Sequence, residues 1–70
     1  MFEFKQYFIQ FKNEKDFEEV SNWVFTPGDV IDISFPEMSI HFKDDETLET
    51  WYGCILWNHI KDENLIIHKD

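Results

Sequence analysis

The chain has 70 residues, of which fifteen are acidic and six basic, and its formal net charge is −9. This length accommodates one domain, residues 1–70, and the single cysteine, Cys54, excludes an internal disulfide. The negative charge repels phosphate backbones and anionic lipids, so we expect no direct contact with nucleic acid or with a membrane.

The N-terminal residues and the amino-acid composition indicate the cellular location and the source of the protein. The chain begins Met1-Phe2-Glu3 without a basic stretch or a long apolar run, and no segment approaches the roughly 20 apolar residues that cross a bilayer. We therefore expect a cytoplasmic protein. The lack of Ala and Arg, beside frequent Phe, Ile, Lys and Asn, is typical of AT-rich coding. A low-GC bacterium or its phage is a suitable source, and a phage protein would act in the host cytoplasm.

Residues 2–12 predict a strand, because Phe, Tyr and Ile are dense there and nothing interrupts them. Both faces of this strand carry apolar residues, which favours a central place in a sheet. One face carries Phe2, Phe4 and Phe8, and the other carries Tyr7, Ile9 and Phe11.

Residues 14–25 predict a helix with Asn13 as its N-cap and with Phe17, Val20 and Val24 on one side. The turn at Pro27-Gly28 follows. Residues 30–43 then predict a hairpin. A two-residue loop would pair Phe35 with Met38, Ile33 with Ile40, and Ile31 with Phe42 on one face. Pro36-Glu37 is not a preferred hairpin turn, so a longer loop is an alternative.

The strongest helix signal lies in residues 44–61. An acidic start, which favours a helix N-terminus, precedes apolar residues at helical spacing. These are Leu48, Trp51, Tyr52, Ile55, Leu56, His59 and Ile60. We expect this helix to end near residues 62–64, where Asn64 tolerates the left-handed conformation of a C-cap, and a last strand to occupy residues 65–69.

The resulting order, strand–helix–strand–strand–helix–strand, resembles the ferredoxin-like split βαβ arrangement. The resemblance implies an α+β fold in which two helices cover one face of a four-stranded antiparallel sheet. The expected core consists of Tyr7, Ile9, Phe11, Phe17, Val20, Val24, Ile31, Ile33, Phe35, Ile40, Phe42, Leu48, Trp51, Tyr52, Ile55, Leu56 and Ile60.

Catalytic and metal-binding patterns are weak. Cys54 and His59 point about 140° apart on a helix and cannot share one ion. Asp32 opposite His41 is more often a cross-strand contact than an acid–base pair. The chain has no glycine-rich phosphate loop. We expect no enzyme, cofactor or metal; a small hydrolase using Asp32, His41 and Cys54 is a third hypothesis.

Two apolar surface features suggest partner contacts. Trp57 lies on the polar side of the second helix near Gly53, which favours an interface anchor, unless the chain end folds over it. Phe4 and Phe8 lie on the sheet face away from the helices, which suggests a self-contact, unless a bulge turns them inward.

Acidic residues gather at both predicted helix starts. In a split βαβ fold we expect the two helices to run roughly parallel, so that both groups lie at one end of the domain and form a concentrated negative field. The residues are Glu14, Asp16, Glu18, Glu19, Asp44, Asp45, Glu46 and Glu49.

These features predict a small acidic inhibitor that blocks a basic, nucleic-acid-binding surface of a partner protein such as a nucleic-acid enzyme or a defence effector. In size, charge and aromatic content the chain resembles phage anti-defence proteins, including anti-CRISPR and DNA-mimic proteins, and nuclease-immunity proteins. The alternative is a homo-oligomeric structural or ligand-binding module that associates, at least as a homodimer, through the open sheet face.

Overall fold

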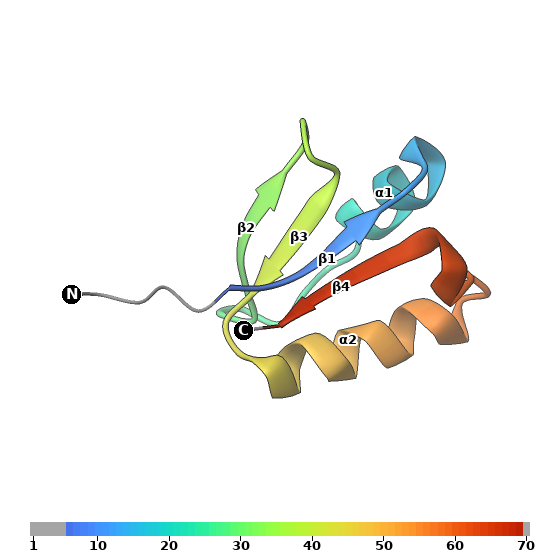
Figure 1. Ribbon diagram of the computed structural model, residues 1–70. Coiled ribbons are helices and arrows are strands. Elements are labelled where there is room, and N and C mark those ends of the chain that lie inside the picture. Colours follow the sequence, from blue (N-terminus) through green and yellow to red (C-terminus); the bar gives the residue numbers. More distant parts are fainter. Residues whose placement is uncertain (1–5, 70) are drawn as a thin grey trace.

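The computed structural model describes residues 6–69 and has the predicted α+β architecture (Figure 1). Four strands form one sheet in the order β2-β3-β1-β4, and all neighbours are antiparallel. This is the strand order of a ferredoxin-like fold, so the predicted fold class is confirmed. The elements are β1 (Tyr7–Phe11), α1 (Glu14–Ser21), β2 (Val30–Ser34), β3 (Ser39–Phe42), α2 (Asp45–Trp57), the short 3-10 helix η1 (Asp62–Asn64) and β4 (Leu65–Lys69).

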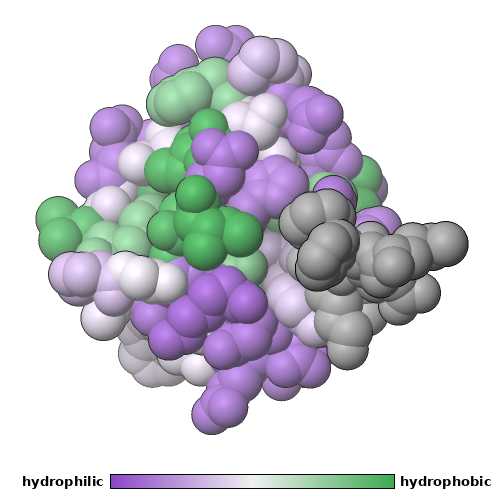
Figure 2. Space-filling view, turned by 90° about the vertical axis from the view of Figure 1, so that its left-hand side faces the viewer, coloured by the Kyte–Doolittle hydropathy of each residue, from purple (hydrophilic) through white to green (hydrophobic). Residues whose placement is uncertain are grey.

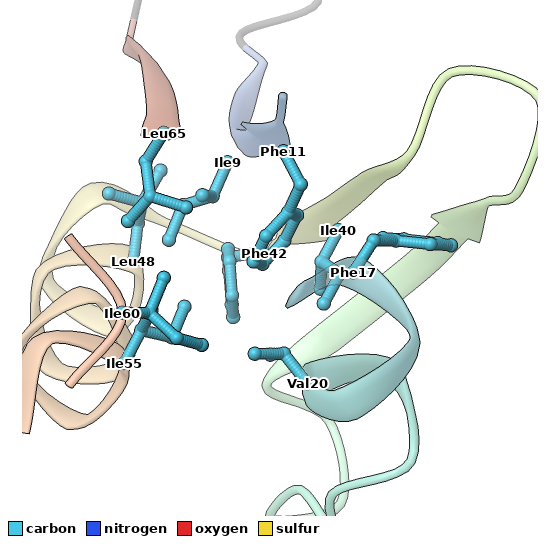
Figure 3. Packing of buried hydrophobic residues seen from close by; sticks show 10 residues of the cluster. All are labelled: Ile9, Phe11, Phe17, Val20, Ile40, Phe42, Leu48, Ile55, Ile60 and Leu65. Atoms are coloured by element: carbon cyan, nitrogen blue, oxygen red, sulfur yellow. The ribbon is translucent and has the colours of Figure 1, made fainter. Parts of the chain in front are cut away.

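The core lies between the two helices and one face of the sheet (Figure 3). Alternate residues of the central strands β1 and β3 point toward the helices, as the two-residue period of a strand requires. Tyr7 pairs with Phe42 and Ile9 with Ile40, which sets the register of these strands. The fully packed residues are Ile9, Phe11, Phe17, Val20, Ile40, Phe42, Leu48, Ile55, Ile60 and Leu65.

Both helices begin where the sequence predicts. The Asn13 side-chain oxygen accepts a hydrogen bond from the Asp16 backbone N–H at 2.8 Å, and Asp44 accepts one from the Thr47 N–H at 2.8 Å. Each bond satisfies one of the N–H groups that have no partner inside the helix. The predicted N-cap Asn13 is therefore confirmed, and Asp44, the first residue of the predicted acidic start, is the N-cap of α2.

Both helices end earlier than the sequence predicts. The Asn22 side chain donates to the Glu18 carbonyl at 2.7 Å, and that of Asn58 donates to the Cys54 carbonyl at 2.8 Å. These side chains satisfy carbonyls of the last turn, so each helix stops one residue before its Asn. His59, not Asn64, adopts the left-handed conformation after α2, with φ of 69°.

The β2–β3 hairpin contains a bulge that the predicted register lacks. Ile33 pairs with Ile40 as predicted, but Val30, not Ile31, lies opposite Phe42. Residue 31 is the extra residue, and its side chain is 67% exposed. The connection is the longer alternative: the last ladder pair is Ser34–Ser39, and the turn covers residues 35–38.

Four residues predicted for the core lie at the surface instead. Ile31 is exposed because it is the extra residue of the bulge, and Phe35 is exposed because it lies in the four-residue turn. Val24 is 94% exposed because α1 ends before it. Leu56 is partly exposed at 37%. Phe25 and Val30 pack against the core in place of Val24 and Ile31.

Candidate protein-binding surface

The two helix starts lie at opposite ends of the sheet, so the prediction of a single acidic end is wrong (Figure 1). α1 follows β1 and α2 follows β3, and these two strands are antiparallel. The last residues of β1 therefore lie beside the first of β3, and each helix starts at the end where the other finishes. We call the end where α1 begins the α1 end, and the other the α2 end.

At the α2 end, part of the negative charge has a role within the chain. Asp44 caps α2, and its hydrogen bonds from Thr47 lower the pKa of its carboxyl group. Glu49 accepts a hydrogen bond from Lys69, which raises the pKa of that lysine. Asp45 and Glu46, both exposed, remain directed to solvent in the first turn of α2.

The α2 end also has a mixed surface. Figure 2 views the molecule from this side, and hydrophobic residues gather between hydrophilic ones there. Asp29 lies beside α2. Its carboxylate is 3.5 Å from Lys43 Nζ and accepts a hydrogen bond from the Trp51 indole N–H at 3.1 Å. Carboxylates held in this way have less capacity to pair with a partner's cations.

At the α1 end, the four predicted carboxylates of α1 have fewer partners within the chain than those at the α2 end. Glu14, Glu18 and Glu19 are exposed, and Asp16 is half-buried and accepts a 2.7 Å hydrogen bond from the Asn13 side-chain amide. Within the described part of the chain, no lysine lies within ion-pair distance of any of the four. Their charges are directed mainly to solvent.

Three further carboxylates, which the sequence did not assign to the site, lie at the same end. Lys12 N–H donates to the Asn64 carbonyl at 2.9 Å, which brings η1 beside the start of α1. The Gln10 side chain donates to the Glu37 carbonyl at 3.1 Å, which places the β2–β3 turn there as well. We call the combined set the α1-end carboxylates: Glu14, Asp16, Glu18, Glu19, Glu37, Asp62 and Glu63.

Trp57 is exposed and belongs to the α1 end. It is the last residue of α2, which starts at the α2 end and runs to the opposite one (Figure 1). Its side chain is 84% exposed, so the alternative in which the chain folds over it is wrong. One turn earlier, a Cβ added to Gly53 would meet no atom within 4 Å. The surface beside the indole is therefore open.

On the sheet face away from the helices, Phe8 lies between two imidazoles. Its ring centroid is 4.7 Å from that of His41 on β3 and 4.6 Å from that of His68 on β4. The orientation of Phe8 away from the core is confirmed, and β1 pairs without a bulge from Tyr7 to Phe11. Both ring faces are occupied within the chain, so Phe8 offers mainly its edge. Phe2 and Phe4 lie outside the described residues.

The residues of the third hypothesis do not meet. Asp32 pairs with His41 in the β2–β3 ladder on the open face, and Cys54 is exposed on α2, which packs on the other face. His41 Nε2 instead lies 3.1 Å from Ser39 Oγ. Among residues 6–69, no group of three His, Cys, Asp or Glu side chains is arranged to hold a metal ion.

Comparison with known proteins gives no relative: no family model, curated protein or solved structure matches the chain. Among the described residues, neither helix has the length and apolar character needed to cross a bilayer.

Proposed function

We propose that this protein binds a basic surface of another protein and blocks it. The α1-end carboxylates would pair with lysine and arginine side chains that otherwise bind nucleic acid, in a nucleic-acid enzyme or a defence effector. The observation that carries the proposal is the joint presence, at one end, of seven carboxylates from three segments and an indole that is 84% exposed.

The two features have separate roles. Carboxylates at the rim of an interface increase the association rate and select a basic partner. A tryptophan that becomes desolvated at the centre of an interface supplies much of the binding energy. The proposed contact site therefore consists of the α1 end and the last turn of α2 instead of the two helix starts. The contribution to partner binding of the residues at the start of α2 is secondary; these are Asp44, Asp45, Glu46 and Glu49.

Affinity capture from a low-GC bacterial lysate tests this proposal with two matched variants. Glu14→Lys/Glu18→Lys and Asp45→Lys/Glu46→Lys change the net charge equally, and all four side chains are exposed. We expect the α1 variant and Trp57→Ala to lose proteins that the wild type captures, and the α2 variant to retain them. Captured proteins should bind nucleic acid, and added wild-type protein should inhibit that binding.

Circular dichroism of each variant provides the control for folding. Equal capture by the wild type and all variants would contradict the proposal, as would captured proteins whose nucleic-acid binding the protein leaves unchanged. Loss of capture in the α2 variant alone would return the site to the start of α2.

A further inference from the structure

The two edges of the sheet differ in their ability to accept another strand. The β2 edge contains the bulge at Ile31 and is followed by Pro36, and both features oppose strand pairing. β4 pairs with β1 at all five of its residues without a register shift. Within residues 6–69 no strand pairs with its other side, so β4 presents a regular edge with unpaired backbone groups.

Two backbone hydrogen bonds show which groups of β4 face outward. Phe11 N–H donates to Met38 O, and Lys12 N–H donates to Asn64 O, so successive β1 residues face β3 and β4 in turn. Because bonded pairs alternate along an antiparallel ladder, Ile66 and His68 face β1, and Leu65, Ile67 and Lys69 direct their backbone groups outward. The Leu65 N–H is already bonded to Asp62 O in η1.

Lys69 and Glu63 carry opposite charges near the two ends of this edge. Lys69 is the last residue of β4 and precedes Asp70, and Glu63 lies two residues before the strand. In an antiparallel pair of two β4 strands, Lys69 of each copy therefore comes toward Glu63 of the other. A two-fold axis repeats every such contact, as a symmetric dimer requires.

We propose that β4 is the interface for a second copy of this chain, with the two-fold axis at Ile67. The two Ile67 residues would exchange backbone hydrogen bonds, and each Lys69 N–H would donate to the Leu65 carbonyl of the second copy. The two sheets become one sheet of eight strands. Lys69 would lie opposite Leu65 of the second copy, and Glu63 stands two residues before Leu65 in η1, so the long lysine side chain can extend toward it. Its ammonium group has three donors, of which Glu49 takes one.

The interface also covers apolar surface. Ile66 is 45% exposed on the open face, and in this register it lies across from His68 of the second copy. The net charge of −9 on each copy opposes association. At about 150 mM salt the Debye length is about 8 Å, so that repulsion is screened more than ion pairs in contact. The dimer interface shares Asp62 and Glu63 with the α1-end carboxylates but uses neither Trp57 nor the carboxylates of α1, so the dimer does not rest on the partner binding proposed above.

A charge swap tests the dimer by analytical ultracentrifugation at micromolar to submillimolar concentration. We expect Glu63→Lys and Lys69→Glu each to raise the dimer dissociation constant at least about tenfold, and the double variant to restore it to within about threefold. Lys69 has its bond with Glu49, not Glu63, within one chain, so folding does not explain such a rescue. Glu18→Lys, with the same charge change on α1, should keep the dimer.

Amide hydrogen exchange provides the second readout. Protection of the Ile67 and Lys69 N–H groups should rise with protein concentration, whereas Ile66 and His68 should be protected throughout because they face β1. A protein that stays monomeric over this range would overturn the proposal. So would a dimer that tolerates both single variants, or one whose Ile67 amide exchanges at the same rate at every concentration.

Discussion

Asp44 connects helix geometry with pH. Its capping bond from the Thr47 N–H is stronger when the carboxylate is ionised, and this bond lowers its pKa from the ordinary value of 3.8. A group with a lowered pKa stabilises the fold above its ordinary pKa, and the contribution is lost as the pH falls through the lowered value. We expect Asp44→Ala to lower Tm by a few degrees at pH 7, and the difference from wild type to shrink below about pH 3.8, measured by thermal unfolding. A difference that persists unchanged at pH 2 would contradict this role for the charge. Asp44→Asn, which keeps an oxygen acceptor, should lose less than Asp44→Ala.

Replacing each of the two glycines by alanine should have opposite effects on the free energy of unfolding. A Cβ at either position would meet nothing within 4 Å, so space does not decide the outcome. Gly53 lies inside α2, where Ala is favoured over Gly by about 0.5–1 kcal/mol, and we expect Gly53→Ala to raise the free energy of unfolding by that amount. Gly28 has φ of +90°, so Gly28→Ala should lower it by about 1–2 kcal/mol. Chemical denaturation measures both. Destabilisation by Gly53→Ala would show that the helix surface there is not open.

At the scale of the elements, the sequence predicts where helices start better than where they end. Asn13 and Asp44 each precede a helix with a local signal, a capping oxygen followed by acidic residues. The ends depend on whether Asn22 and Asn58 turn back to bond a carbonyl of the last turn. Helical spacing continues beyond both residues in the sequence, so the pattern alone extends each helix too far.

The bulge in β2 predicts that Ile31 and Ile33 contribute unequally to the free energy of unfolding. In a regular register, Ile31 and Ile33 would be equivalent, because side chains two residues apart share a face. In the bulged strand, of these two residues only Ile33 packs against the core. We expect Ile33→Ala to cost about 2 kcal/mol and Ile31→Ala less than about 0.5 kcal/mol in free energy of unfolding, measured by urea denaturation. Equal costs for the two variants would show that the strand has no bulge in solution.

At the scale of the whole molecule, the strand directions determine which charged residues lie at the same end of the domain, and the sequence pattern does not reveal this. The order of elements was sufficient to predict the fold, and it also fixes the separation of the helix starts, since β1 and β3 are antiparallel. Acidic runs identify the charges but not their neighbours. Glu37, Asp62 and Glu63 join the α1 end only through contacts between distant segments, Gln10 with Glu37 and Lys12 with Asn64, which no local spacing reveals.

The same charge distribution makes the stability of the protein depend on salt. Carboxylates without lysine partners repel one another over about 30 Å at 10 mM salt but only about 8 Å at 150 mM. We expect Tm to rise by several degrees between these conditions, because screening relieves repulsion that unfolding would otherwise relieve. Glu18→Gln should reduce the rise, since Glu18 has no cationic partner in the described residues, whereas Glu49→Gln should not, since it removes the partner of Lys69. Calorimetry at both salt concentrations measures the effect. A Tm that falls with added salt would mean that the pairs Lys69–Glu49 and Lys43–Asp29 outweigh the repulsion, and would remove the electrostatic argument for a basic partner.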